Sequence, residues 1–360
     1  MDRIYLVPGF FGFANLGDLR YFGHVVPLLR DHGEVEVVST HPTASLTARA
    51  RILHDAIAAS SKPGDRVHLV GHSSGGLDAR LFVAPGAKLG NGLDPSAIAE
   101  RVRTVVTVAS PHRGTPSAEV FTTVAGKALL RALSLMTIVV LRRGGLPLQV
   151  VLQVSELLVS SEKLLASDPK MLDEVFSGLL GELSPERRRQ VETFFTAMGA
   201  DQGLLPQLMP DAMTLFGATT ADRPGVRYGS VVTRARRPGM VGVASAGLSP
   251  VGQAGFAWFT LCWGLASRFG DPELDPTLRQ ALAERYPGLG PADNDGMVPT
   301  LSQPWGELIR AVDADHLDVI GHFGDRSTDP PHHDWFTTGT GYDRNAFEAT
   351  WIDIAQFFAT

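Results

Sequence analysis

The chain has 360 residues, of which 44% are hydrophobic and 19% are charged, and 32 Lys and Arg against 38 Asp and Glu give a formal net charge of −6. This length and composition exclude a disordered chain and allow one large domain or two ordinary ones. No long basic run is present, so we expect no nucleic-acid partner. Cys262 is the only cysteine and cannot form an internal disulfide, which fits a reducing compartment or a bacterial exoprotein that lacks bridges.

The apolar stretches of the chain are short. The longest, residues 132–141 and 146–154, fall well below the roughly 20 residues that a spanning helix needs, so we expect no transmembrane anchor. Residues 1–7 lack the apolar region of a signal peptide and indicate the first strand of the fold. The cytoplasm is therefore the default location, and secretion without a cleaved signal stays open.

Short apolar strands alternate with helices in the first third of the chain. The pattern predicts strands at residues 4–7, 34–38, 67–70 and 103–109 and helices at residues 20–32, 45–60 and 77–83. This alternation is typical of an α/β fold, with a mainly parallel sheet covered by helices on both faces.

The pattern changes between residues 117 and 220. Long apolar helical segments, at 128–141 and 150–165, replace the strands, and a polar helix is predicted at 185–195. A strand pattern resumes at 225–232, and 345–358 is an amphipathic helix with Asp343 as its cap. We therefore expect a core made of residues 1–116 and 221–360, and a helical lid or cap insertion at 117–220 over the carboxyl edge of the sheet.

Residues 71–75 (GHSSG) match the pattern G-x-S-x-G directly between a predicted strand and a predicted helix. That context is the one the nucleophile elbow of α/β-hydrolases requires, because the sharp turn exposes the serine hydroxyl. The motif predicts Ser73 as nucleophile and places the Ser74 N–H at a helix N-terminus, where it can stabilise an oxyanion. A Ser/Gly-rich turn is the alternative reading.

A second oxyanion donor is expected in the loop that leaves the first strand. Residues 6–12 read LVPGFFG, and a loop turning at Gly9 can aim the Phe10 N–H at the same oxyanion. A simple turn after the strand would account for Pro-Gly equally well.

In α/β-hydrolases the acid follows the serine and the histidine comes last. This order leaves His316, His322, His332 and His333 as candidates for the base. The turn at residues 293–299 (DNDGMVP) offers Asp293 and Asp295 as candidates for the acid, although Asp-Gly is also common in plain turns.

Five motifs together give the chain its resemblance to a known family. They are residues 7–10 (VPGF), 71–76 (GHSSGG), 110–116 (SPHRGTP), 294–298 (NDGMV) and 315–318 (DHLD). In this order they resemble the bacterial true lipases, within them the Pseudomonas, Burkholderia and Proteus group. Pro8 stands where that family usually has His, Ser74 where it usually has Gln, and the insertion is longer, which leaves substrate preference open.

The resemblance implies His316 as the base and favours Asp295 over Asp293 as the acid. It requires no cofactor for the chemistry, but it implies a structural calcium ion held by Asp318 and a second, earlier aspartate. Asp275 fits that second position best and Asp271 is the alternative. Carboxylate oxygens suit calcium, whereas helix capping by Asp275 and solvation of Asp318 are the ordinary roles of such residues.

The apolar patches of the insertion predict a lid that lines an acyl-binding cleft and contacts a lipid interface, although core packing would give the same composition. We therefore expect a carboxylic ester hydrolase, a lipase or esterase acting on acylglycerols or similar apolar esters. An acyltransferase or polyester depolymerase with the same residues is the first alternative. A catalytically silent lipid-binding protein on a hydrolase scaffold is the second.

Overall fold

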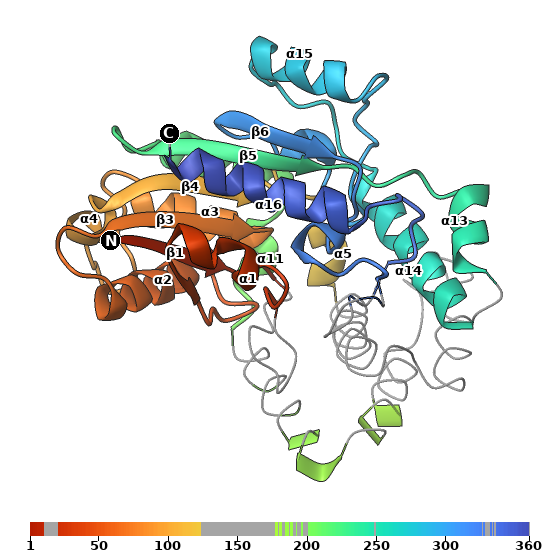
Figure 1. The fold of residues 1–360 in the computed structure, drawn as a ribbon, viewed down its shortest axis with the longest axis horizontal. Coiled ribbons are helices and arrows are strands. Elements are labelled where there is room, and N and C mark those ends of the chain that lie inside the picture. The colour runs from red at the N-terminus through yellow and green to blue at the C-terminus, as the bar shows by residue number, and fades with distance from the viewer. Residues whose placement is uncertain are drawn as a thin grey trace.

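The computed structural model describes residues 1–10, 21–123 and 201–359, apart from 248–249, 326, 328–331, 333 and 335, and only scattered residues between 177 and 196. Its centre is a six-stranded parallel sheet with strand order β2-β1-β3-β4-β5-β6 (Figure 1). The strands are β1 (Asp2–Val7), β2 (Glu34–Val37), β3 (Arg66–His72), β4 (Val102–Val108), β5 (Arg227–Thr233) and β6 (Glu307–Val312).

Helices cover both faces of the sheet, as its parallel strands require. Those with four or more residues are α1 (Val26–Leu29), α2 (Leu46–Ser60), α3 (Ser74–Val83), α4 (Ser96–Ala99), α5 (Ser117–Thr122), α11 (Leu204–Gln207), α12 (Pro210–Thr219), α13 (Met240–Ala246), α14 (Pro250–Ala266), α15 (Pro276–Arg285) and α16 (Arg344–Ala359). Short 3-10 helices are η1 (Arg30–His32), η2 (Thr300–Ser302) and η3 (Asp318–Ile320). No helix in the described ranges is long and apolar enough to span a bilayer.

Alternate residues of the buried strands enter different cores, because successive side chains of a strand point to opposite faces. In β1, Ile4 and Leu6 pack in the cluster that contains Trp351 of α16, whereas Tyr5 and Val7 pack in the cluster built on α2 and α3. All four strand residues are fully buried. This two-sided burial explains why β1 reads as a continuous apolar run.

The predicted strands at 4–7, 34–38, 67–70, 103–109 and 225–232 are confirmed as β1 to β5, with small shifts at their ends. The helix predicted at 45–60 is α2, and its cap is the Ser45 hydroxyl, which accepts the N–H of Ala48. The last helix is α16, and Asp343 caps it by accepting the N–H of Ala346. These boundaries follow from local capping chemistry.

The helix predicted at 20–32 is wrong in extent. Residues 21–25 form turns, and only Val26–Leu29 is α-helical, followed by the short helix η1. Pro27 in the first turn of α1 explains this start, because proline has no N–H to bond to the preceding turn. The strand β6 and the helices α13 to α15 were not predicted.

Three described helices, α5, α11 and α12, lie within the predicted insertion 117–220. The apolar segments 128–141 and 150–165 lie outside the described residues, as does most of 185–195. The extent of the insertion and its role as a lid therefore stay predictions.

Candidate active site

The strand β3 ends at His72 and the helix α3 begins at Ser74, so Ser73 occupies the turn between them. Its backbone has φ 56° and ψ −132°, a conformation that residues other than glycine rarely adopt. Two glycines make room for it: a Cβ on Gly75 would lie 2.1 Å from the Val7 carbonyl oxygen, and one on Gly9 would lie 2.4 Å from the Ser73 Cβ. The GHSSG sequence thus forms the strained strand-to-helix turn that it predicts.

Asp295 and His316 are joined directly. The His316 Nδ1 lies 2.8 Å from the Asp295 Oδ2. The backbone N–H of His316 also donates to the backbone carbonyl of Asp295, at 2.9 Å. Because a carboxylate accepts, Nδ1 carries the proton and Nε2 is left with its lone pair. Asp295 is fully buried and His316 is 2% exposed, so water does not compete for this bond.

Four further hydrogen bonds fix the Asp295 carboxylate. Its Oδ1 accepts the N–H groups of Met297 and Val298, at 2.9 and 2.7 Å. Its Oδ2 accepts from the Thr233 hydroxyl at 2.7 Å and from the Gln303 side-chain amide at 3.3 Å. Sequence reasoning missed Thr233 and Gln303, since neither belongs to a motif and the fold alone brings them together. Asp295 lies in the loop before η2, within the turn that the sequence predicts.

Ser73 and His316 line the same small pocket. Among the described residues no hydrogen bond joins the Ser73 hydroxyl to His316, although both side chains line this pocket. Such contacts are often long in structures without substrate.

The other candidates for the base have contacts that do not involve Asp295. His332 Nδ1 bonds the Gly321 carbonyl, and its ring stacks on His24 and Phe323. His322 is buried, and its backbone N–H donates to the Leu317 carbonyl. His333 lies outside the described residues. Of the candidate bases, His316 is the one bonded to Asp295.

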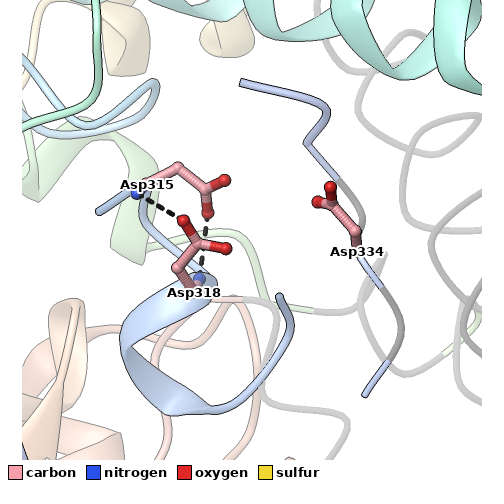
Figure 2. A group of neighbouring side chains, drawn as sticks. All are labelled: Asp315, Asp318 and Asp334. Carbon is pink, nitrogen blue, oxygen red and sulfur yellow. Dashed lines mark hydrogen bonds between the residues drawn. The ribbon is translucent and has the colours of Figure 1, made fainter. Parts of the chain in front are cut away.

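An acidic cluster lies beside His316. Asp315, Asp318 and Asp334 have carboxylate oxygens within 4.8 Å of one another. Asp315 and Asp318 each accept the backbone N–H of the other, and Asp334 faces them across a gap (Figure 2). Burial, and then the charge of a neighbouring aspartate, raises the pKa of both Asp315 and Asp318 well above the usual range.

No Lys or Arg within the described ranges forms an ion pair with these three carboxylates. Carboxylate oxygens are hard donors that suit a calcium ion. The negative charges of three neighbouring aspartates would be balanced in part by the two positive charges of that ion. The donor chemistry therefore suits the metal that the resemblance implies.

The two aspartates expected as partners of Asp318 have other contacts in this structure. Asp275 is exposed and caps α15, where its carboxylate accepts the N–H groups of Thr277 and Leu278. The alternative, Asp271, pairs with Arg279 at 2.8 Å. A Pro after Asp275 favours a cap at that position, and the sequence distance between Asp318 and Asp334 gave no reason to join them.

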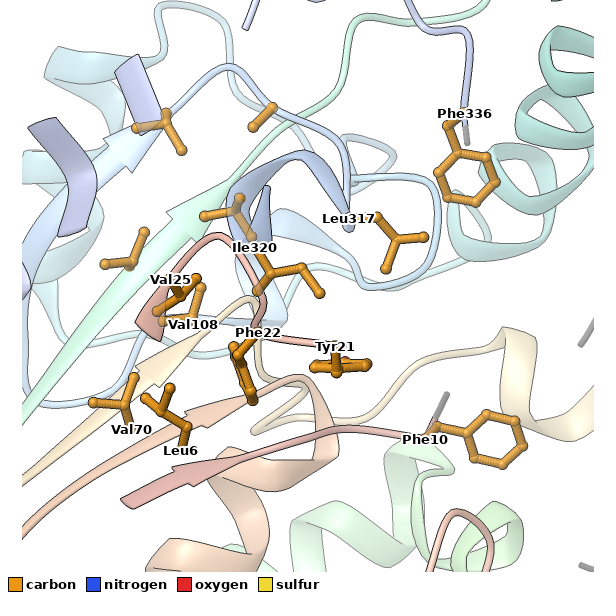
Figure 3. Packing of buried hydrophobic residues seen from close by; sticks show 14 of the residues in the cluster. Leu6, Phe10, Tyr21, Phe22, Val25, Val70, Val108, Leu317, Ile320 and Phe336 are labelled. Carbon is orange, nitrogen blue, oxygen red and sulfur yellow. The ribbon is translucent and has the colours of Figure 1, made fainter. Parts of the chain in front are cut away.

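The loop after β1 carries Phe10 and is called the oxyanion loop below. It is held at one peptide unit, Pro8–Gly9. The Gly9 N–H donates to the Tyr21 hydroxyl at 3.3 Å, and the Pro8 carbonyl of the same unit accepts from Arg49 Nη2 at 2.7 Å. The loop after β6 carries His316 and is called the histidine loop below. Tyr21 and Phe22 lie between its Leu317–Ile320 segment and the buried residues of the strands, such as Leu6 and Val70 (Figure 3). The Pro8–Gly9 peptide, which precedes the peptide that carries the Phe10 N–H, is thus fixed through both its N–H and its carbonyl.

Arg49 reaches the loop from α2 and is fully buried. Its guanidinium also donates to the His41 carbonyl and forms an ion pair with Asp78 of α3 at 2.7 Å. Burial raises the pKa of Asp78 to about 6, although Arg49 opposes the shift. The Arg49 guanidinium thus joins the Pro8 carbonyl to α2 and α3.

His72 joins the oxyanion loop to the histidine loop. Its Nε2 lies 2.9 Å from the His316 carbonyl, which can only accept, so Nε2 carries the proton. Its Nδ1 therefore accepts from the Tyr21 hydroxyl, at 2.6 Å. Burial, and then the nearby His316, lowers the pKa of His72 well below the usual range. His72 is thus neutral and connects the two loops through Tyr21.

The pocket in front of Ser73 is mostly apolar. Its lining comprises Phe10, Ser73, Pro111, Thr115, Ser117, Ala118, Phe121, Leu205, Leu208, Met297, Val298 and His316. Ser74 begins α3, and the first N–H groups of a helix have no partner within it. An apolar group bearing one reactive carbonyl suits this lining.

Comparisons with known proteins agree with this architecture. Residues 34–137 match the family model described as the PGAP1-like alpha/beta domain. No match was found among curated proteins.

Several solved structures are similar across 99% of this chain. EstA from Clostridium botulinum has a TM-score of 0.56 at 15% identity over 86% of its own length, and lipase 1 from Pelosinus fermentans 0.55 at 17% over 98%. The Staphylococcus hyicus lipase has 0.53 at 16% over 95%. Membership of the Pseudomonas, Burkholderia and Proteus group stays a prediction, and the sheet, the helices and these likenesses show that the chain has the α/β-hydrolase fold.

Proposed function

We propose that this protein is a serine carboxylic-ester hydrolase. The observation that carries the proposal is the Asp295–His316 hydrogen bond beside Ser73 in one apolar pocket. The bond sets the imidazole tautomer that a general base needs, and the strained turn at Ser73 is the conformation of an activated nucleophile. The likeness to bacterial lipases and esterases supports the same class.

The reaction proceeds in two halves. The Ser73 Oγ attacks the ester carbonyl carbon while His316 Nε2 takes the hydroxyl proton, and Asp295 stabilises the imidazolium that forms. The Phe10 and Ser74 N–H groups stabilise the tetrahedral oxyanion, each with about 3 kcal/mol of the barrier. His316 then protonates the leaving alcohol. In the second half His316 takes a proton from a water molecule that attacks the acyl carbon, and it returns this proton to Ser73 Oγ as the acid leaves.

The substrate class is inferred from the pocket. Phe10, Phe121, Leu205 and Leu208 surround the Ser73 hydroxyl with apolar surface, which favours an apolar acyl chain over a charged one. We propose acylglycerols or similar apolar esters, with residues 117–220 acting as a lid over this pocket and as the lipid contact.

A chain-length series tests both parts of the proposal. p-Nitrophenyl esters from acetate to palmitate, together with a triglyceride emulsion, are assayed with the parent chain and Ser73→Ala. We expect kcat/KM to rise with chain length and to vanish in Ser73→Ala. Unchanged hydrolysis in that variant would remove Ser73 from the mechanism, whereas a strong preference for acetate would remove the apolar substrate alone.

Two alternatives are separated by other readouts. An acyltransferase with the same residues would form new esters when an alcohol acceptor is added, at the expense of free acid. A silent lipid-binding protein would bind a fluorophosphonate probe without covalent labelling. The presence of base, acid and nucleophile around one pocket supports hydrolysis over the silent alternative.

We also propose that Asp315, Asp318 and Asp334 hold a calcium ion. Bound there, the ion would neutralise the crowded carboxylates and brace the loop that carries His316. Asp318 belongs to the earlier prediction, and Asp315 and Asp334 replace Asp275 in it. The chemistry at Ser73 requires no metal.

A further inference from the structure

A second pocket lies across the 111–119 segment from Ser73. Its volume is about 610 Å³, which is within the range of small-molecule sites. It shares no lining residue with the Ser73 pocket, because neighbouring residues of the segment face opposite ways. His112, Arg113, Pro116 and Glu119 line the second pocket, whereas Pro111, Thr115, Ser117 and Ala118 line the first. Below it is called the Arg113 pocket.

Arg113 brings a positive charge that pairs with no acid among the described residues. Its guanidinium is half-buried and donates from Nη1 to the Pro304 carbonyl at 2.9 Å, and no described carboxylate lies within ion-pair distance of it. Burial lowers its pKa to about 10, with no opposing effect from an acidic neighbour. A half-buried guanidinium that lacks an acidic partner has donors left to bind an anionic group.

A second cation, Arg80, lies behind two lining residues of the pocket, His112 and Trp305. These two residues and Arg113 are called its floor below. Arg80 is 1% exposed, stacks 3.3 Å from the centre of the Trp305 ring and donates to His112 Nδ1 at 3.1 Å. Since Nδ1 accepts, His112 donates from Nε2 to a threonine hydroxyl and is neutral. Asp222 is not within ion-pair distance of Arg80, but its negative charge acts to raise the Arg80 pKa against the larger, opposite effect of burial. Arg113 thus brings a positive charge to the floor and Arg80 a second one behind it, opposed in part by Asp222, which accepts from Trp305 Nε1 at 3.1 Å.

The walls and the rim differ from the floor. Met213 and Phe269 are buried apolar walls. The rim is exposed and carries four charged side chains, which are Glu119, Arg268, Asp271 and Glu273, with Asp271 paired to Arg279. A ligand must therefore pass a mixed, partly acidic rim before it reaches the cationic floor.

We propose that the Arg113 pocket binds a monocarboxylate with an apolar body. The carboxylate accepts from the free donors of the Arg113 guanidinium, whose planar fork matches two carboxylate oxygens. The apolar body packs on Met213 and Phe269. The rim acids repel a second negative charge, which excludes dicarboxylates. This site goes beyond the proposed hydrolysis and uses none of its residues.

Calorimetric titration of the Ser73→Ala chain tests the proposal, because no turnover then occurs. Octanoate, its dicarboxylate analogue suberate and the neutral 1-octanol are the three probes. We expect octanoate to bind best, and Arg113→Gln to weaken it by about tenfold or more while leaving octanol unchanged. Arg51→Gln, an exposed arginine paired with Asp55 on α2, is the matched control and leaves octanoate affinity as it is.

A second variant keeps the test valid if Arg113→Gln does not fold. Glu119→Gln removes an exposed rim acid and should tighten octanoate about threefold, with a larger gain for suberate. Absence of octanoate binding, equal affinity in folded Arg113→Gln, or no gain in Glu119→Gln would overturn the proposal. Loss of ester hydrolysis in the parent chain would leave these results untouched, so the two proposals fail separately.

Discussion

Replacing Tyr21 with Phe tests how the oxyanion loop is positioned. The substitution removes one hydroxyl and keeps the buried ring, which packs edge-on against Phe22. That hydroxyl accepts the Gly9 N–H and donates to His72 Nδ1. Tyr21 does not touch the reacting atoms, so it is a positioning residue that acts through the Pro8–Gly9 peptide, one unit before the Phe10 N–H.

The structure sets the size of the effect. Tyr21→Phe leaves two buried polar groups unpaired, and each costs about 1–3 kcal/mol, so the free energy of unfolding should fall by about 2–6 kcal/mol. Loss of a whole oxyanion donor costs about 10²–10³ in kcat. A displaced donor costs less than a missing one, so we expect kcat to fall about 10- to 100-fold with KM nearly unchanged.

The assay is steady-state hydrolysis of a p-nitrophenyl ester, with urea unfolding on the same samples. Tyr5→Phe is the matched control, because its hydroxyl bonds Ser60 on α2, away from the pocket. The control should lose stability but keep kcat. If Tyr21→Phe loses stability and keeps kcat, or raises KM alone, Tyr21 is a purely structural residue and the reasoning fails.

Three further predictions follow from the site. Asp295→Asn should lower kcat by about 10⁴ without unfolding the chain, because the amide favours the wrong imidazole tautomer; ester kinetics and circular dichroism measure this. The Asp78 pKa of about 6 lies above its unfolded value of 3.8, so the stability from this group is present at low pH and is lost as pH rises through 6. The difference in unfolding free energy between the parent and Asp78→Asn should therefore fall from pH 4 to pH 7, and a constant difference in urea titrations would contradict it. Chelation should lower the melting temperature, calcium should restore it, and neither should affect Asp318→Asn; equal responses of parent and variant in thermal melts would remove the calcium proposal.

Sequence reasoning works where the signal is local. The buried strands β1 to β4 are short apolar runs, and the caps of α2 and α16 are single polar residues next to apolar periodicity, so their positions follow from neighbouring residues. The helix at 20–32 fails because Pro27 acts against its apolar pattern. β6 has mixed burial and an Arg within it, and such a strand resembles a loop until its neighbour β5 is known.

The candidate site divides in the same way. The elbow glycines at 71 and 75 and the Asp-Gly turn at 295 are motifs with a local mechanism, so they point to the residues that the structure brings together. Thr233, Gln303 and the partners of Asp318 come from distant segments. Only the register of the sheet and the fold of the loops place them, and one sequence carries no such signal.

The central claim is that the hydroxyl of residue 73 is the nucleophile, activated by His316. The most direct measurement is mass spectrometry of the intact chain and its peptides after reaction with a fluorophosphonate. We predict one adduct per chain, on the peptide that contains Ser73, with labelling slowed strongly in His316→Gln. An adduct on another serine, or equal labelling of folded Ser73→Ala, would contradict the account.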